Sequence, residues 1–278
     1  MLCNIPDNSF FKKINLMKIS VIGAGAMGGA MVNGFLKGDI FRPSDITVSN
    51  RTQGALDRFA DSGVSLTTDN SVAAADADIV CVAVKPWVAE NVLREIKPVM
   101  DYTRQMLVVV VAGLPSATIL EWMKKDDGTV PPLFLVIPNI AMAERSSMTF
   151  IVPVGASDEQ AKTIKNVFDD AGSSMITEER LLGAGTTLAS CGIAYAMRYV
   201  RAASEGGVQL GFRADEAKHI VLQTVKGAVD LLLANGNHPE AEIDKVTTPG
   251  GLTIRGLNEM EHAGFSSAVI RGLLSALK

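Results

Sequence analysis

Three glycines near the start of the chain have the spacing of a dinucleotide-binding loop. Gly23, Gly25 and Gly28 occupy the G-x-G-x-x-G positions, between an apolar run over 18–22 and a helical pattern that begins at Ala26. In such a loop the first glycine makes the sharp turn, the second lets the backbone approach a pyrophosphate, and the third lets the helix pack on the strand. The alternative is a tight strand–helix turn that binds nothing, and the flanking pattern favours the dinucleotide site.

The end of the second predicted strand indicates which dinucleotide the loop would hold. A site for NAD usually carries Asp or Glu there, which binds the ribose 2′-hydroxyl. This chain has Asn50, Arg51 and Thr52 instead, with no acidic residue. The guanidinium of Arg51 can pair with a 2′-phosphate, and its two neighbours can add hydrogen bonds. The sequence therefore favours NADPH over NADH, and the alternative for Arg51 is a solvated side chain at a helix start.

Three further strand ends offer loops that could border the reactive part of the cofactor, because ligands of open α/β sheets bind outside the carboxyl ends of the strands. Val84, Lys85 and Pro86 close one predicted strand, and Ala112 follows the next. We expect backbone contacts from these loops, with a solvated side chain as an equal alternative for Lys85. Asn139 follows another strand, and its amide could bridge cofactor and substrate; an ordinary turn residue is the alternative.

The most specific pattern in the second half of the chain is a proline followed by two glycines. Pro249, Gly250 and Gly251 stand directly before a predicted helix, with the hydroxyls of Thr248 and Thr253 on either side. Backbone N–H groups at a helix N-terminus attract anions, so this segment suits a small carboxylate. A capped helix start without a ligand is the alternative.

The elements that would position these loops alternate between strand and helix through the first half of the chain. Short apolar runs predict strands, and amphipathic runs predict helices. Strands are predicted over 18–22, 46–49, 78–84, 106–111, 133–137 and 148–152, and helices from 26 and over 52–62, 86–96, 116–125 and 158–171. This alternation predicts an α/β fold with a Rossmann-type doubly wound parallel sheet, which we expect over residues 17–177.

From about residue 181 the pattern is helical to the end, and we expect an all-helical domain over 178–278. Small and apolar residues occur on most faces of its predicted helices. A helix that is apolar all round must be buried on all sides, and about 100 helical residues cannot easily do this alone. We therefore expect a homodimer or higher homo-oligomer built through these C-terminal helices. The alternative is a compact monomeric bundle.

Composition narrows the class of protein further. The 278 residues have a formal net charge of −4, which gives no general attraction to nucleic acid or to membranes. No apolar stretch has membrane-spanning length. The few cysteines form no disulfide framework, which favours a reducing, cytoplasmic compartment, and the histidines lack metal-ligand spacing. Residues 1–16 are expected to be a disordered extension or the product of a misassigned start.

In their order along the chain, these motifs resemble those of the pyrroline-5-carboxylate reductases. The shared motifs are the glycine loop, Asn-Arg-Thr at 50–52, Ala-Val-Lys-Pro at 83–86, Ala-Gly at 112–113, Pro-Asn at 138–139, Val-Thr-Thr-Pro-Gly-Gly-Leu-Thr at 246–253 and an echo of a C-terminal element, Ala-Gly-Phe, at 263–265. The resemblance covers residues 17–277, and the proline–glycine–glycine segment is its most specific part.

The resemblance implies the NADPH- or NADH-dependent reduction of 1-pyrroline-5-carboxylate, a cyclic imine, to L-proline, the last step of proline biosynthesis. It also implies a Rossmann domain with a helical dimerisation domain, and a substrate site shared between subunits. Carried over by motif, the cofactor-binding residues are Gly23, Gly25, Ala26, Met27, Gly28, Asn50, Arg51, Thr52, Val84, Lys85, Pro86 and Ala112. The substrate-binding residues are Thr248, Gly250, Gly251, Thr253 and Asn139. Thr253 is the expected catalytic residue, as a hydrogen-bond partner of the ring nitrogen while it becomes an amine.

Two positions depart from the family's pattern. The family usually has threonine where this chain has Ile140, and proline where it has Ile193. The lost hydroxyl and the lost proline keep two alternatives open. One is a reductase of another cyclic imine or a keto acid on the same scaffold, and the other is a cofactor-binding paralogue without turnover.

Overall fold

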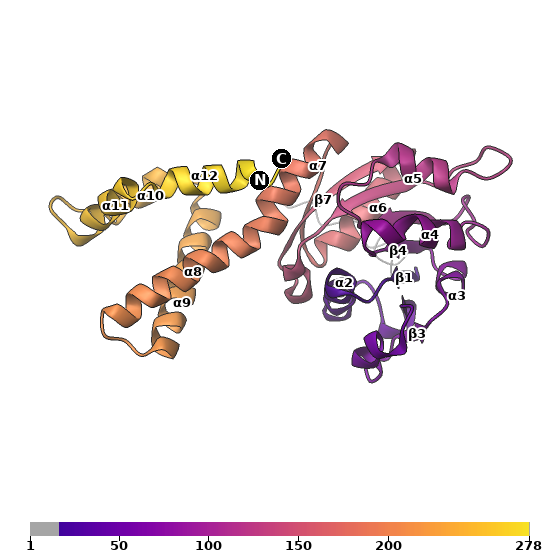
Figure 1. Cartoon of the computed structure of the whole chain (residues 1–278), viewed down its shortest axis with the longest axis horizontal. Helices are drawn as coiled ribbons and strands as arrows, with labels where there is room; N and C mark the ends of the chain where they lie inside the picture. The colour runs from indigo at the N-terminus through magenta and orange to yellow at the C-terminus, as the bar shows by residue number, and fades with distance from the viewer. Residues whose placement is uncertain (1–16, 278) are drawn as a thin grey trace. The chain divides into compact units, whose positions relative to one another are not determined.

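The chain divides into two compact units, one that ends at Ser190 and one that begins at Cys191. The computed structural model describes residues 17–277, so the extension expected over 1–16 lies outside the described residues. In Figure 1 the first unit runs from indigo through magenta, and the second runs from orange to yellow. The domain boundary predicted after residue 177 stays a proposal. Within residues 17–277, no helix is long and apolar enough to cross a membrane.

The first unit is built on one 8-stranded sheet with the order β3-β2-β1-β4-β5-β6-β7-β8. Its strands are β1 (Ile19–Ile22), β2 (Ile46–Ser49), β3 (Ser65–Thr67), β4 (Ile79–Val82), β5 (Met106–Val109), β6 (Leu133–Ile137), β7 (Ser147–Val154) and β8 (Gly172–Ile176). Neighbouring strands are parallel except β6 and β7, which are antiparallel. This sheet confirms the Rossmann-type doubly wound fold. The carboxyl ends of β1 and β4 meet where the strand order reverses, the usual ligand position in such sheets.

Helices cover both faces of the sheet and close two apolar cores. α2 (Ala26–Lys37) and α6 (Asp158–Asp169) pack on one face, α3 (Asn70–Ala75), α4 (Pro86–Ile96) and α5 (Ser116–Met123) pack on the other, and η1 (Pro43–Asp45) precedes β2. On the first face, the rings of Phe35 and Phe168 meet edge to face, with centroids 6.1 Å apart. Successive residues of a strand point to opposite faces, so Val21 enters one core and Ile22 the other.

The helix predicted over 52–62 is wrong, because this segment forms two short 3₁₀ turns. They are η2 (Gln53–Ala55) and η3 (Asp57–Phe59). Gly54 disfavours an α-helix by about 1 kcal/mol relative to alanine. The buried side chains, Leu56 and Phe59, lie three positions apart, which is the repeat of a 3₁₀ helix.

The sheet also contains features that the sequence patterns did not predict. β3 and β8 have partly exposed side chains and no continuous apolar run. The antiparallel direction of β7 follows from its short connection to β6, which holds only the turn η4 (Ile140–Glu144). A parallel neighbour needs a crossover of about a dozen residues or more.

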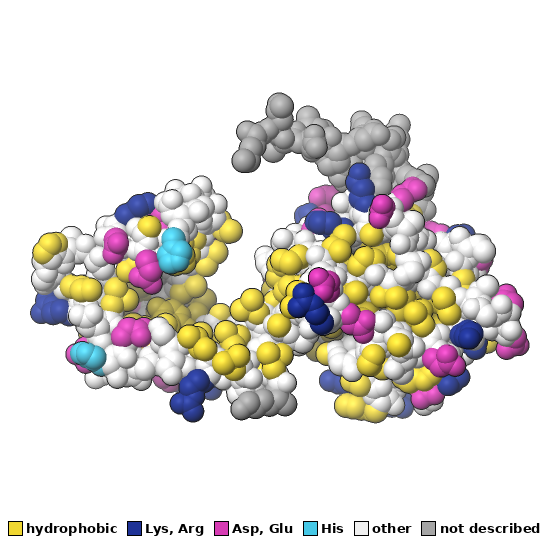
Figure 2. Space-filling view, turned by 90° about the horizontal axis from the view of Figure 1, so that it is seen from above, with side chains coloured by type: hydrophobic (Ala, Val, Ile, Leu, Met, Phe, Trp, Pro, Cys, Tyr) yellow, Lys and Arg dark blue, Asp and Glu magenta, His cyan; other side chains and the backbone are white. Residues whose placement is uncertain are grey.

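The second unit is all helical, as predicted, but it buries almost none of its side chains. The chain reaches it through η5 (Glu179–Leu181), α7 (Leu182–Gly185) and the π-turn η6 (Thr186–Cys191), and its helices are α8 (Gly192–Gln209), α9 (Ala214–Asn235), α10 (Pro239–Lys245), α11 (Leu252–His262) and α12 (Phe265–Ser275). Among its described residues only Ala217 is buried. Leu210 and Leu252 are more than four-fifths exposed, at 83% and 81%. Hydrophobic side chains accordingly show on the surface of this unit at the left of Figure 2.

Candidate active site

The three glycines of the loop after β1 differ in how closely their surroundings approach them. Gly23 has φ +106°, and a Cβ there would lie 2.5 Å from the carbonyl oxygen of Ala83. A Cβ on Gly28 would lie 1.8 Å from the carbonyl oxygen of Gly23, so this glycine lets α2 pack against the turn. At Gly25 a Cβ would meet nothing within 4 Å. The second glycine of the motif is therefore the one that leaves its backbone open to a ligand.

The loop forms one wall of a cavity of about 590 Å³ at the carboxyl ends of β1, β4 and β5. Gly25 is the N-cap of α2, and no side chain caps this helix end. The first amides of a helix have no intrahelical acceptor, and they favour an anionic partner. Every predicted cofactor-binding residue lines the cavity except Gly28, which lies behind the loop; those that line it are Gly23, Gly25, Ala26, Met27, Asn50, Arg51, Thr52, Val84, Lys85, Pro86 and Ala112.

Asn50 fastens the glycine loop to the end of β2. Its Oδ1 accepts a hydrogen bond from the backbone N–H of Ala24 at 3.1 Å. Its Nδ2 donates to the carbonyl oxygen and the hydroxyl of Thr52, both at 3.2 Å. Arg51 lies between these two residues, with an exposed side chain on the cavity wall. This exposed cation stands where a cofactor's 2′-substituent would be selected.

Asn70 is a lining residue that the sequence patterns missed. It is the first residue of α3, the helix that follows β3, and its Oδ1 accepts a hydrogen bond from the Ser49 hydroxyl at 2.6 Å. Its Nδ2 donates to Oε2 of Glu95 at 2.8 Å. Because β3 was not predicted, no strand end pointed to Asn70 as a candidate.

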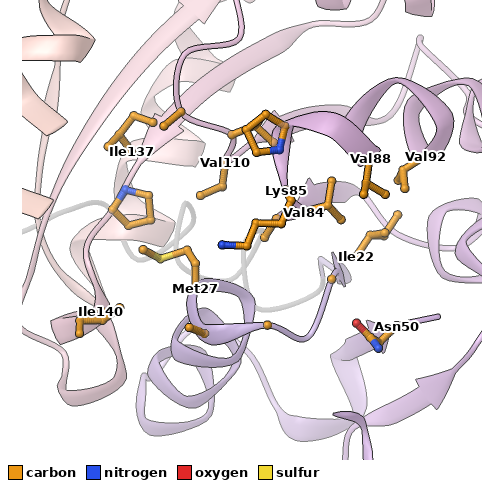
Figure 3. A pocket seen from close by; sticks show the side chains of 18 of the residues that line it. Ile22, Met27, Asn50, Val84, Lys85, Val88, Val92, Val110, Ile137 and Ile140 are labelled. Carbon is orange, nitrogen blue, oxygen red and sulfur yellow. The ribbon is translucent and has the colours of Figure 1, made fainter. Parts of the chain in front are cut away.

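The opposite wall comes from the ends of β4 and β5. Lys85 is the extended N-cap of α4, and Pro86 occupies the first helical position, where the missing N–H is not needed. Figure 3 shows the Lys85 side chain reaching into the cavity, with Met27 and Val110 also on its walls. Most of these lining side chains are apolar, which suits an aromatic ring held by shape and by backbone contacts.

Asn139 lies beside the cavity without lining it. Its side chain is 4% exposed, and its Oδ1 caps η4 by accepting from the N–H of Ala141 at 3.0 Å. The neighbours Pro138 and Ile140 line the cavity. The side chain of Asn139 therefore acts as a turn residue that caps η4. Its contact with substrate stays a prediction.

The predicted substrate residues Thr248, Gly250, Gly251 and Thr253 all belong to the second unit, at the start of α11. The N–H of Gly251 donates to the carbonyl oxygen of Thr248 at 2.9 Å, and Gly250 has φ +71°. Residues 248–251, with Pro249 and Gly250 at the central positions, therefore form a type II turn. Gly251 caps α11 without a side-chain hydrogen bond. The turn therefore leaves helix amides available, and the exposed hydroxyls of Thr248 and Thr253 flank them.

The described residues contain no cluster of histidine, cysteine, aspartate or glutamate that could hold a metal ion. The thiol of Cys81 is fully buried in β4, and burial raises its pKa well above the usual range. This cysteine is therefore part of the core and has no nucleophilic role.

Comparison with known proteins places these features in a family. Residues 179–278 match the family model described as pyrroline-5-carboxylate reductase dimerisation, and residues 18–113 match that of the NADP oxidoreductase, coenzyme F420-dependent. Pyrroline-5-carboxylate reductase 2 of Dictyostelium discoideum is 32% identical over 94% of this chain and 91% of its own length. The enzyme of Methanosarcina acetivorans is 33% identical over 93% and 95%. The chain belongs to the pyrroline-5-carboxylate reductase family.

Other relatives extend this result. Pyrroline-5-carboxylate reductase 1 of Dictyostelium discoideum is 36% identical over 93% of this chain, but the match covers only 48% of that protein. A solved pyrroline-5-carboxylate reductase from Coxiella burnetii superposes with a TM-score of 0.84 at 26% identity, over 94% of this chain and 96% of the other. The Plasmodium falciparum enzyme, solved with NADP bound, shares the fold with a TM-score of 0.85 at 23% identity, over 95% and 97%.

Proposed function

We propose that this protein reduces 1-pyrroline-5-carboxylate to L-proline with NADPH. The observation that carries the proposal is the cavity at the carboxyl ends of β1, β4 and β5, lined by the dinucleotide motifs in a chain of this reductase family. The exposed Arg51 and the lack of an acidic residue at the end of β2 support NADPH over NADH.

The described residues fit such a dinucleotide. The open backbone at Gly25 suits a pyrophosphate, because a Cβ there would meet nothing within 4 Å while Gly23 and Gly28 are held tightly. Arg51 and Thr52 would hold the adenosine end, and Val84 and Ala112 would border the nicotinamide. When bound, the cofactor supplies the hydride that reduces the C=N bond.

The chain itself has mainly to bind and orient the imine. A protonated imine is already electrophilic, so no strong general acid is needed, and alignment of the reacting carbon provides much of the catalysis. The N-terminal amides of α11 would bind the carboxylate, with Thr248 adding a hydroxyl. Thr253 would hydrogen-bond the ring nitrogen, the interaction that strengthens as the nitrogen becomes an amine.

The helical unit would act as a homo-oligomer. The side chains of Leu210, Leu233 and Leu252 in this unit are mostly exposed, and residues 179–278 match a dimerisation model. A second copy of the chain is the partner that would cover these side chains. Neither nucleic acid nor a membrane surface is an expected partner. We place the enzyme in the cytoplasm, where the buried Cys81 and the partly buried Cys191 would stay reduced.

One observation favours a second candidate function. Ile140 lines the cavity and is 50% exposed. It stands at a position where the family usually has threonine. A larger apolar side chain there would suit another cyclic imine or a keto acid of different polarity.

A substrate panel tests both candidates. NADPH consumption is followed with 1-pyrroline-5-carboxylate, with a six-membered cyclic imine acid and with keto acids. The highest kcat/KM with 1-pyrroline-5-carboxylate and proline as the product are expected. A higher value with another compound would reassign the substrate. NADPH binding with no turnover on any compound would identify a cofactor-binding paralogue.

A further inference from the structure

The side chain of Arg58 lies against the glycine loop although none of the dinucleotide motifs includes it. Arg58 belongs to η3, and its Nη2 donates to the carbonyl oxygen of Ala24 at 2.5 Å and to that of Gly25 at 3.0 Å. Its guanidinium carbon lies 4.7 Å from the centroid of the Phe59 ring, which is buried. Two carbonyl groups and one aromatic face therefore hold the guanidinium in place.

Gly29, one residue beyond the motif, makes room for this side chain. A Cβ on Gly29 would lie 2.0 Å from Nη2 of Arg58 and 2.5 Å from its Cζ. Glycine within a helix is about 1 kcal/mol less favourable than alanine. The G-x-G-x-x-G motif does not require a glycine at this position, so the contact with Arg58 gives it a physical reason.

The bond from Arg58 to the carbonyl of Ala24 fixes which way the next amide points. The carbonyl of Ala24 shares a peptide unit with the N–H of Gly25, and the carbonyl of Gly25 shares one with the N–H of Ala26. A trans peptide is planar, with its C=O and N–H in opposite directions. Arg58 holds the carbonyl of Ala24, so the N–H of Gly25 points to the other side of the loop. The carbonyl of Gly25 also accepts from the N–H of Gly29 at 2.9 Å, so α2 itself orients the N–H of Ala26 and Arg58 adds a second bond to that carbonyl. Gly25 and Ala26 line the cavity.

We propose that Arg58 is a positioning residue for the pyrophosphate of the cofactor, and that Gly29 is required to admit it. By holding the carbonyl oxygen of Ala24 behind the loop, Arg58 keeps the amide of Gly25 directed at the phosphates, next to the amide of Ala26, which α2 orients. The proposal rests on the proposed function, since it needs a pyrophosphate-containing dinucleotide. It differs from the role of Arg51, which would contact only a 2′-phosphate.

The direct test is Arg58→Ala, with equilibrium binding of NADPH, NADH and adenosine 2′-monophosphate. NADPH and NADH share the pyrophosphate, so both dissociation constants should rise by the same factor of about tenfold, as for one lost hydrogen bond to a charged group. Adenosine 2′-monophosphate has no pyrophosphate and should bind as before. Arg94→Ala is the matched control, because this exposed arginine is ion-paired only to Glu90 of its own helix in the described chain, and it should change none of the three.

Gly29→Ala tests the same contact while the arginine stays in place. The added methyl group should displace the guanidinium from the carbonyls, so Gly29→Ala alone should weaken NADPH and NADH as much as Arg58→Ala does. In the double variant Arg58→Ala/Gly29→Ala, the methyl group meets no guanidinium and should add no further loss. If Arg58→Ala does not fold, Gly29→Ala carries the comparison, because alanine favours the helix.

Four results would overturn the proposal. Wild-type affinity of Arg58→Ala for both dinucleotides would remove the positioning role. A loss confined to NADPH would make Arg58 a 2′-phosphate ligand, and an equal loss for adenosine 2′-monophosphate would indicate general collapse of the site. Additive losses in the double variant would remove the requirement for Gly29. Wild-type protein that binds NADPH but does not reduce the imine would count against the proposed function and leave these comparisons valid.

Discussion

The first unit buries its own core on both faces of a sheet, whereas the helices of the second unit leave nearly all of their side chains exposed. The first unit contains fully buried residues from every layer, such as Phe35, Leu93 and Phe134. In the second unit, Ala217 is the only described residue that is buried. The free energy of folding of the first unit is therefore internal to one chain, and that of the second depends on what covers its helices.

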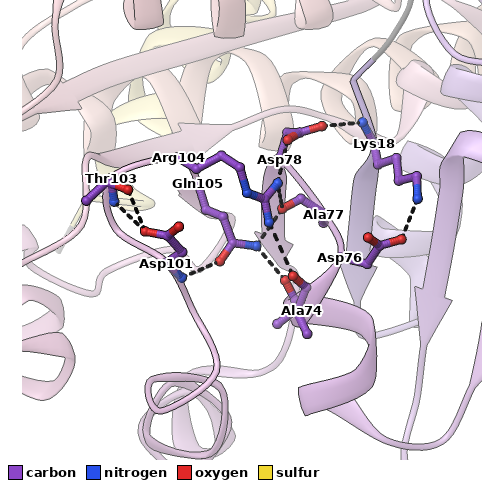
Figure 4. Close-up of polar contacts among 10 residues, drawn as sticks. Lys18, Ala74, Asp76, Ala77, Asp78, Asp101, Thr103, Arg104 and Gln105 are labelled. Atoms are coloured by element: carbon purple, nitrogen blue, oxygen red, sulfur yellow. Dashed lines mark hydrogen bonds and ion pairs between the residues drawn. The ribbon is translucent and has the colours of Figure 1, made fainter.

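In the first unit, polar side chains form hydrogen bonds to buried backbone groups that apolar packing would leave without partners. Gln105, before β5, is fully buried, and its Nε2 donates to the carbonyl oxygens of Ala74 and Ala77 at 2.6 and 2.5 Å. Its Oε1 accepts from the N–H of Asp101 at 2.7 Å. Figure 4 shows this network at the amino ends of the strands, with Arg104 and Lys18 both bonded to Asp78. The same strands thus have a closed polar end and an open end that borders the cavity.

The largest expected effect is the loss of assembly when a charge enters the exposed apolar surface of the second unit. Ile270 in α12 is 56% exposed, and burying an aspartate at an interface without a partner is strongly unfavourable. Ile270→Asp should convert the oligomer to a monomer with lower helix content and no reductase activity. Sedimentation and circular dichroism measure both changes. Asn258→Asp adds the same charge at an exposed polar position and should assemble normally. An active wild-type monomer would show that the second unit does not depend on a partner for its stability.

Gln105→Leu is the substitution that should destabilise the first unit without affecting assembly. It removes the side-chain donor to the buried carbonyl of Ala74 and leaves the carbonyl of Ala77 with Arg104 Nη1 alone, at 3.2 Å. An unsatisfied buried group costs about 1–3 kcal/mol. The free energy of unfolding should fall by about 1–3 kcal/mol, the cost of that one group, measured by urea denaturation. The oligomeric state and the NADPH dissociation constant should stay unchanged, because the residue lies at the opposite end of the strands from the cavity. Dissociation of the oligomer by this variant would show that the two units are not independent in stability.

Thr253→Ala tests whether the second unit contributes to chemistry as well as to assembly. Loss of one hydrogen bond worth about 1.4 kcal/mol in the transition state lowers kcat by roughly tenfold. Thr248→Ala should mainly raise KM for the imine, since a carboxylate contact exists before the reaction. Neither variant should change NADPH affinity, measured separately from steady-state kinetics. Wild-type turnover of Thr253→Ala would leave that residue only a structural role at the start of α11.

The cofactor preference should depend on the first unit alone. Arg51→Ala removes the cation that would pair with a 2′-phosphate, so KM for NADPH should rise by about tenfold, as for one charge-assisted contact. KM for NADH, which lacks this phosphate, should change little. Equal losses with both cofactors would exclude the 2′-phosphate role.

Local patterns predicted most of the first unit, and long-range contacts account for what they missed. The loop from Gly23 to Gly28 was predictable because all the glycines that determine its shape lie in one short contiguous motif. Arg58 was not, because its acceptor on Ala24 lies 34 positions away in the chain. Asn70 was missed for the same reason, because its hydrogen-bond partner Ser49 lies 21 positions away in the chain. The strand between them, β3, has no apolar run that would predict it. The apolar surface of the second unit was predictable from composition, but its interface with a partner requires a second copy.

The smallest expected effect concerns a buried hydroxyl in the first unit. Ser20 in β1 is fully buried, and its Oγ is the one buried side-chain polar atom among residues 17–277 that has no hydrogen-bond partner. Ser20→Ala removes an unsatisfied group and should raise the free energy of unfolding by about 1 kcal/mol. Ser174→Ala is the matched control, because the hydroxyl of Ser174 donates to Asp169 at 2.6 Å, and it should lower the same quantity by about 1 kcal/mol. Opposite signs, measured by thermal and urea denaturation, would show that polar satisfaction contributes to the stability of the first unit alongside its packing. A loss at both positions would mean that the shape of the Ser20 side chain, rather than its hydroxyl, is what the core requires.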